Sequence, residues 1–237
     1  MDLLLDSLRE AVRLLLSGNA YLWDVVLLSL RVSGAAVLLG VLLGMPLGIA
    51  VALGRFRGRR LLVALIHTGF ALPPVVVGLF IYMVFSRSGP AGALELLFTP
   101  AAMIAAQAVL AMPYVAGITL AAVQAVPGDV RLQAAALGAS RGRALWMQLR
   151  EARLGLGAAV VAGFGAVISE VGAVMLVGGN IVGETRVMTT AIVLETRRGN
   201  FATALALGLL LLLLAFAVNL ALTRAQQGHR GMERMWS

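Results

Sequence analysis

Long apolar runs separated by short charged segments form the main pattern of this chain. A helix needs about 20 apolar residues to cross the ~30 Å hydrocarbon layer of a bilayer, and several runs reach that length. The predicted spans are residues 25–53, 61–85, 100–126, 154–177 and 201–223. The pattern predicts an all-α integral membrane protein with about five transmembrane helices in one domain, residues 21–224.

Residues 1–20 show an amphipathic pattern instead. Asp2, Asp6 and Arg13 share one helical stripe, and leucines occupy much of the remaining surface. This arrangement favours a helix that lies in the membrane interface. A secretory signal peptide would begin with positive charge, whereas Asp2 comes first here, so we expect this segment to be retained.

Glycines and prolines add detail within the spans. Gly40, Gly44 and Gly48 recur at four-residue spacing on one face of the first span, where a neighbouring backbone can approach closely. Pro73 and Pro74 interrupt the second span. A broken helix is tolerated in a bilayer only where it is buried in protein or faces a water-filled path. The proline pair therefore indicates either a packing device or a kink beside a pore.

The segment between the last two spans, residues 178–200, is too polar to cross the membrane. Its apolar part, residues 187–194, is also too short. We expect a surface or re-entrant element here.

Composition supports the membrane assignment and narrows the chemistry. Hydrophobic residues make up 60% of the chain, charged residues make up 13%, and the mean hydropathy is +0.95, whereas soluble domains carry about 25% charged residues. The net charge of +8 is carried by arginines that lie mostly in loops, so membrane topology explains it better than a nucleic-acid partner. Without cysteine, and with His67 and His229 as the two histidines, the sequence predicts neither a metal site nor a cofactor.

The arginine distribution predicts the orientation. Twelve of the 19 arginines lie in the loop 55–60, the loop 127–153 and the C-terminal segment from Arg224, and six lie in segments on the other side. Cytoplasmic loops are the arginine-rich ones. We therefore expect the N-terminus outside, and the loop 127–153 and the tail 225–237 in the cytoplasm.

The loop 127–153 predicts a helix, a sharp corner and a second helix. Pro127 suits a first helical turn, Gly138 can close that helix in the left-handed conformation, and Ser140 can cap the next one. Its small side chains would fit a groove on another protein, and a plain solvated loop is the alternative. The candidate docking residues are Arg131, Leu132, Gln133, Ala134, Ala135, Gly138, Ala139, Ser140 and Arg141.

The chain contains no lysine. The phosphate-binding loop of a P-loop ATPase requires one. If transport is driven by ATP, hydrolysis must occur in a separate subunit, and this chain is expected to be a transport component and not an enzyme.

Two stretches resemble a known family. The loop 127–153 resembles the cytoplasmic "EAA" loop of ABC-importer permeases in its Gly138-Ala-Ser corner, although Leu132 and Gln133 stand where that family usually has Glu and Ala. Residues 169–199 are similar to tungstate-type ABC permeases, relatives of molybdate and sulfate permeases. The shared features are an intramembrane Glu, a Gly-Gly-Asn turn and a Thr-Arg-Val-Met-Thr-Thr run.

The resemblance implies a type I ABC-importer permease fold and uptake of an oxyanion. Tungstate is the first candidate substrate, and molybdate and sulfate are the alternatives. It also implies a homodimer embedded in lipid, an external oxyanion-binding protein and two cytoplasmic ATPases.

Several residues are candidates for a translocation path or gate. The donors of Asn180, Thr185, Arg186, Thr189 and Thr190 would suit an oxyanion near the outer mouth, and Arg186 could instead contact the binding protein or lipid headgroups. Arg31 and Glu170 both lie about 9 Å below the outer boundary, so they could form an ion pair. Alternatively, Arg31 extends outward by itself and Glu170 faces the path or a neighbouring backbone.

Two other classes fit the sequence less well. A secondary transporter would show repeated halves with broken helices, and no second copy of the arginine-rich corner is present. An intramembrane hydrolase would need a base beside its nucleophile, but His67 and Ser169 are predicted at different depths.

Overall fold

The computed structural model describes residues 2–227, and these fold into helices joined by short connections, with no strand among them. Arg230 and Arg234 of the predicted cytoplasmic tail lie outside the described residues. The helices are α1 (Asp2–Leu16), α2 (Ala20–Leu53), α3 (Arg59–Gly69), α4 (Pro74–Phe85), the 3₁₀ turn η1 (Gly92–Leu94), α5 (Pro100–Ala125), α6 (Asp129–Ala136), α7 (Arg141–Glu151), α8 (Arg153–Ile168), α9 (Gly172–Gly178), α10 (Met188–Arg197) and α11 (Phe201–Gln227).

Three of the described helices, α2, α5 and α11, are long and apolar enough to cross a membrane. Two bent pairs, α3 with α4 and α7 with α8, raise the number of candidate spans to 5 if each pair counts as one. The prediction of an all-α membrane protein with several spans is confirmed. α2 has 34 residues, or ~51 Å at 1.5 Å per residue, so it extends beyond the ~30 Å hydrocarbon layer or tilts within it.

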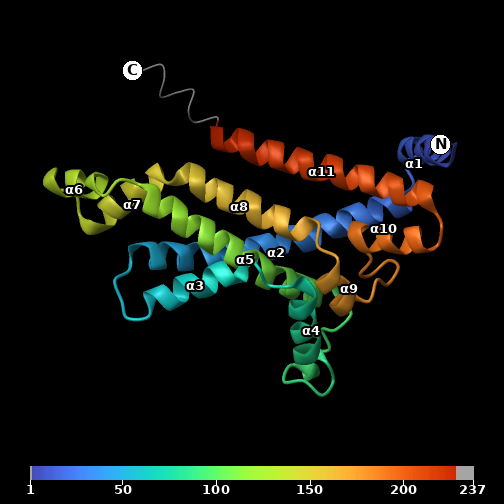
Figure 1. The fold of residues 1–237 in the computed structure, drawn as a ribbon, viewed down its shortest axis with the longest axis horizontal. Coiled ribbons are helices and arrows are strands. Elements are labelled where there is room, and N and C mark those ends of the chain that lie inside the picture. The colour runs from blue at the N-terminus through green and yellow to red at the C-terminus, as the bar shows by residue number, and fades with distance from the viewer. Residues whose placement is uncertain (1, 228–237) are drawn as a thin grey trace.

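The molecule is elongated, and different helices and loops lie at its two ends (Figure 1). The α2–α3 loop and the α6–α7 corner lie at one end, and α11 runs toward that end. α1, α10 and the start of α11 lie at the other. The two loops at the first end are the arginine-rich loops of the sequence.

α2 and α5 form the central pair of the bundle. The three glycines at four-residue spacing on α2 are buried against α5. A Cβ at Gly40 would lie 2.9 Å from the Cβ of Ala111, and one at Gly44 would lie 2.7 Å from the carbonyl oxygen of Met112. Because the two backbones approach this closely, larger residues on this face would push the helices apart.

The second predicted span, residues 61–85, is interrupted at the proline pair, as the sequence indicated. The chain bends by 102° between α3 and α4, because Pro73 is extended and Pro74 starts the new helix. The bend rests on α5: Tyr114 donates its hydroxyl to the carbonyl of Phe70 at 3.1 Å, and the two rings stack at 5.0 Å. These contacts agree with a packing device, and they orient α4 across the other helices (Figure 1).

The fourth predicted span, residues 154–177, is also interrupted. α8 ends at Ile168 and α9 begins at Gly172. Gln107 of α5 donates its Nε2 to the carbonyl of Val167 at 3.0 Å, which gives an oxygen at this helix end an additional donor. One side of the break is therefore packed against α5, while Ser169 within it is exposed.

α10 occupies the segment that the sequence predicts as a surface or re-entrant element. It has 10 residues, or ~15 Å, which is about half the hydrocarbon thickness. It packs against α11 and α2. α1 packs on α11 at the same end of the molecule, with exposed ion pairs between Asp6 and Arg9 at 3.5 Å and between Glu10 and Arg13 at 3.6 Å.

Candidate functional site

The α6–α7 corner forms through local backbone signals. Gly138 has φ +77°, a left-handed conformation that glycine adopts without strain. Its N–H bonds the carbonyl of Ala135 at 3.0 Å, and the N–H of Ala139 bonds that of Ala134 at 2.9 Å. This is the hydrogen-bond pattern of a Schellman motif. Ser140 then caps α7 by accepting a hydrogen bond from the N–H of Arg143 at 3.4 Å.

The exposed surface of this corner differs from the compact alanine face suggested by the sequence. Ala134 is buried between α6 and α7, because it lies on the side of α6 that faces the returning helix. Leu132 and Leu137 are instead 69% and 86% exposed. Arg131, Gln133, Ala135 and Arg141 are also exposed. The corner therefore presents apolar and cationic side chains together.

The corner is attached firmly to the membrane helices. Gln148 of α7 donates its Nε2 to the carbonyl of Val123 at 3.3 Å, near the end of α5. Val123, Val126 and Ala152 form a small buried cluster beside this bond. Only Ala152 separates α7 from α8, and the two helices meet at 60°.

At the other end of α8, Glu170 lies in the break before α9. Its carboxylate accepts a hydrogen bond from the N–H of Ala173 at 3.0 Å, so it satisfies a donor in the first turn of α9. The backbone carbonyl of Glu170 accepts a hydrogen bond from the Thr189 hydroxyl of α10 at 2.8 Å. Glu170 therefore links α8, α9 and α10.

The ion pair considered between Arg31 and Glu170 is not formed: no ion pair joins these two residues in the described part of the chain. Arg31 is exposed on α2. Glu170 lies where its carboxylate reaches the Ala173 N–H instead. The predicted pair rested on the equal depth of the two residues in the membrane. Equal depth does not make the helix faces that carry the two side chains point toward each other.

Arg186 is not the exposed loop residue that its position suggested. It is 8% exposed, and its guanidinium donates to the side chain and the carbonyl of Asn180, both at 3.2 Å. A third donor reaches the hydroxyl of Tyr21 in α2 at 3.5 Å. Asn180 has φ +56°, so the turn that it forms with Gly179 carries backbone strain.

The three threonines of this segment use their hydroxyl donors inside the protein. Thr185 bonds the carbonyl of Gly178, and Thr190 bonds that of Val187 at 3.0 Å. Thr189 bonds Glu170 as described above. The structure thus brings the predicted path residues of 170–190 together, but with these donors directed into the protein.

Sequence reasoning missed Ser29 and Tyr21 as partners of this segment. Ser29 accepts a hydrogen bond from the N–H of Met188 at 2.8 Å and donates to the carbonyl of Val25 at 2.7 Å. It is buried on α2. The sequence did carry a signal for Ser29, which is a polar residue inside a long apolar run. Such a side chain needs a hydrogen-bond partner in the membrane.

No group of three or more His, Asp or Glu side chains lies close enough to hold a metal ion among residues 2–227. The candidate site around Glu170 and residues 180–190 consists of hydrogen-bonded side chains and helix ends.

Residues 44–230 match the family described as "binding-protein-dependent transport system inner membrane component". This match covers most of the chain. The chain belongs to this family. As an inner-membrane component of such a system it is a multi-pass membrane protein and a transport subunit, while ATP hydrolysis belongs to separate subunits.

Relatives with assigned names cover nearly the full length. The chain is 47% identical over 204 residues to a probable anion ABC transporter permease of Haloferax volcanii, covering 84% of this chain and 88% of that protein. It is 37% identical over 227 residues to a tungstate uptake system permease of Peptoclostridium acidaminophilum, covering 96% of this chain and 100% of the relative. A molybdenum transport permease of Mycobacterium tuberculosis is 32% identical over 81% of this chain and 75% of its own length.

Solved structures agree on the fold. A bacterial ABC transporter that imports alginate superposes with a TM-score of 0.74 at 18% identity, covering 92% of this chain and 82% of the other. The MetNI methionine ABC transporter superposes with a TM-score of 0.66 at 18% identity, covering 88% and 94%. The predicted ABC-importer permease fold is thereby confirmed.

Proposed function

We propose that this chain is the permease of an ABC importer that carries tungstate into the cytoplasm. The observation that carries the proposal is the 37% identity to a tungstate permease over 96% of this chain and all of the relative. A second tungstate permease, from Campylobacter jejuni, is 33% identical over 92% of both chains. The molybdenum permease matches a shorter part of both proteins, so molybdate is the second candidate.

The working assembly is a homodimer with two cytoplasmic ATPases and an external oxyanion-binding protein. The α6–α7 corner docks on the ATPase through Leu132, Leu137 and the arginines around them. Exposed leucines at a helix corner support this role, because exposed apolar side chains that lie together mark protein interaction sites.

The orientation follows the arginines: the N-terminus is outside, and the corner and C-terminus are cytoplasmic. Support comes from the arginine-rich α2–α3 loop and α6–α7 corner lying at one end of the molecule (Figure 1). Because the chain has no cysteine, single cysteines report the sides directly. A membrane-impermeant thiol reagent added to intact cells should label Ser17→Cys and not Ser140→Cys, and the reverse pattern would refute the orientation.

The residues of the break and of the following segment shape the gate. Glu170, Asn180, Thr185, Arg186, Thr189 and Thr190 hold α9, α10 and α2 together. Their inward hydrogen bonds support a positioning role, with the anion passing beside this network. Arg31, exposed and without a hydrogen bond or ion pair among residues 2–227, supplies positive charge near the outer end.

Elemental analysis of cells tests the substrate. We expect cells that lack this chain to lose most of their tungsten uptake at low external tungstate, and a plasmid copy to restore it. Excess molybdate should compete weakly. Unchanged tungsten accumulation with a matching loss of molybdenum would replace tungstate by molybdate, and unchanged uptake of both elements would refute the oxyanion assignment.

A further inference from the structure

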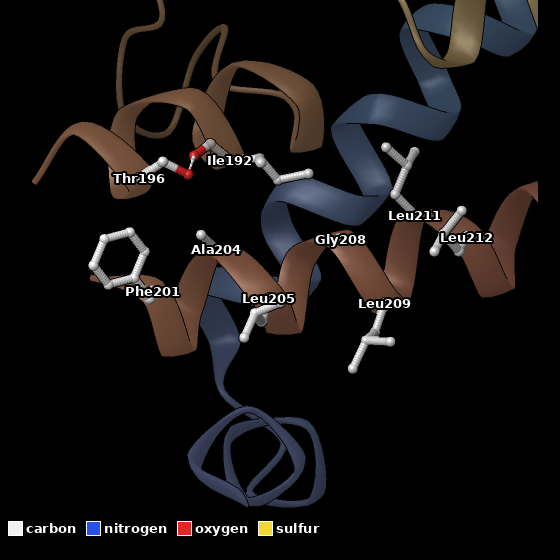
Figure 2. A pocket seen from close by; sticks show the side chains of 9 residues that line it. All are labelled: Ile192, Thr196, Phe201, Ala204, Leu205, Gly208, Leu209, Leu211 and Leu212. Atoms are coloured by element: carbon white, nitrogen blue, oxygen red, sulfur yellow. Dashed lines mark hydrogen bonds between the residues drawn. The ribbon is translucent and has the colours of Figure 1, made fainter. Parts of the chain in front are cut away.

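An apolar groove of about 460 Å³ runs between α10 and α11. Figure 2 shows Ile192 and Thr196 of α10 on one side and leucines of α11 on the other. The Thr196 hydroxyl bonds the carbonyl of Ile192 at 2.7 Å, so its donor is already used. At Gly208 an added Cβ would meet nothing within 4 Å, and this open space adjoins the groove.

The groove runs along α11, a helix that is long and apolar enough to cross a membrane. Only 11% of the apolar window of α11 is buried within the chain, so most of this helix is open to contact lipid. The lining residues run from Phe201 to Leu212 along α11, a distance of ~17 Å at 1.5 Å per residue. One leaflet contributes about half of the ~30 Å hydrocarbon layer, so the groove has the length of one acyl chain.

Two exposed arginines lie at the end of the groove near the membrane surface. Arg197 and Arg198 follow Thr196 directly and precede the start of α11 at Phe201. The side chain of Arg198 is 55% exposed and 3.4 Å from the carboxylate of Glu195, whose other oxygen accepts from Asn200 at 2.7 Å. This ion pair uses one nitrogen of Arg198, whereas the remaining guanidinium of Arg198 and the side chain of Arg197 are exposed.

The position of α1 indicates the depth of the membrane–water interface. The amphipathic α1 packs on α11 at the same end as α10 and exposes its ion pairs. Amphipathic helices of this kind lie at the headgroup level. At the far end of the apolar stretch of α11 stands Arg224. The Arg197–Arg198 pair therefore lies at the depth of phospholipid phosphates.

We propose that this groove binds an anionic phospholipid of the leaflet that contains α1. One acyl chain occupies the α10–α11 groove, and the phosphate is bound by Arg197 and Arg198. The bound lipid supports α10 from its outer side. On its inner side α10 carries Thr189, which bonds Glu170, and Met188, which bonds Ser29, so lipid occupancy acts on the positioning of the gate segment.

Native mass spectrometry of the purified chain with added phosphatidylglycerol or phosphatidylcholine tests both halves of the site. Each arginine near a charged lipid surface contributes about 1 kcal/mol. The double variant Arg197→Gln/Arg198→Gln should therefore bind phosphatidylglycerol roughly 30-fold more weakly, with phosphatidylcholine binding little changed. Arg87→Gln, which removes another exposed arginine, is the matched control and should bind both lipids like the unmodified chain.

Filling the groove tests the acyl-chain half. Gly208→Phe should reduce the binding of both lipids, while Leu213→Phe, at a 61% exposed α11 position outside the groove, should not. If Gly208→Phe does not fold, Ala204→Leu makes the same test nearer the mouth. Unchanged lipid binding by the folded variants would overturn the proposal. Loss of the dimer in place of lipid would also overturn it and assign the groove to a second copy of the chain.

Discussion

Replacing Gly44 with alanine should destabilise the protein, because the added Cβ would be too close to the backbone of α5. The new Cβ would lie 2.7 Å from the carbonyl oxygen of Met112 and 3.2 Å from the N of Ala116. Both atoms belong to the backbone of α5 and cannot rotate away. Gly34 offers a matched control, because it lies in the same helix and an added Cβ there meets nothing within 4 Å.

The magnitude follows from two opposing effects. Alanine in place of glycine stabilises a helix by about 1 kcal/mol, and both variants share this gain. Overpacking a tight contact costs about 1–3 kcal/mol, and only Gly44→Ala has such a contact. The two variants should therefore differ by about 1–3 kcal/mol in the free energy of unfolding, which is roughly 2–12 °C in Tm for a chain of this size.

Thermal unfolding of both purified variants in one detergent provides the measurement. Gly44→Ala should unfold at lower temperature than Gly34→Ala. Gly40→Ala should fall between them, since its nearest neighbour is a side-chain methyl at 2.9 Å. Equal Tm values for Gly44→Ala and Gly34→Ala would refute the reasoning that the glycines are needed for close approach of α2 and α5.

Three further predictions concern the two ends of α8. Gly138→Val should abolish most uptake without reducing the amount of protein in the membrane, because left-handed backbone costs a side-chain-bearing residue about 1–2 kcal/mol. Gly142→Val is the control, because Gly142 lies within α7 and an added Cβ there meets nothing within 4 Å, so this variant should retain uptake. Similar losses of uptake in the two variants would contradict a special role for the corner. Glu170→Ala should lower the free energy of unfolding by about 0.5–2 kcal/mol. Glu170→Gln should lower it by less, since an amide oxygen can still accept a hydrogen bond from the Ala173 N–H. Equal losses of stability in the two variants would argue against capping. In a double-mutant cycle, Arg31→Gln and Glu170→Gln should be additive within about 0.5 kcal/mol, and a larger coupling would restore the ion pair.

The sequence was most informative where structure depends on neighbouring residues alone. The long apolar runs locate α2, α5 and α11, because crossing a bilayer requires a minimum length of apolar helix. The glycine and serine of the corner adopt the conformations that their residue types favour. The proline pair located the bend after α3, but its angle depends on the packing of Phe70 against Tyr114, 44 residues away.

The sequence was least informative where a side chain's role depends on distant partners. Arg186 reads as a loop charge, yet it is buried because Tyr21, 165 residues away, and Asn180 accept its donors. The break before α9 contains no proline, and what stabilises it is a carboxylate that caps the next helix together with Gln107 from α5. Such hydrogen bonds follow from the tertiary arrangement, so residue type and depth cannot predict them.

The position of α8 connects these two kinds of site. It has 16 residues, or ~24 Å, with the α6–α7 corner attached through Ala152 at one end and Glu170 two residues past the other. A helix between such short connections transmits a displacement as a rigid body, whereas a long loop would absorb it. At the Glu170 end, the hydrogen bonds of Thr189 and the Ala173 N–H join α8 to α9 and α10, and Ser29 joins α10 to α2. Any movement of the corner that displaces α8 along its axis must therefore move α9 and α10 or break these hydrogen bonds, which are buried or partly buried. Because an unpaired buried polar group costs about 1–3 kcal/mol, these bonds favour joint movement of α8, α9 and α10.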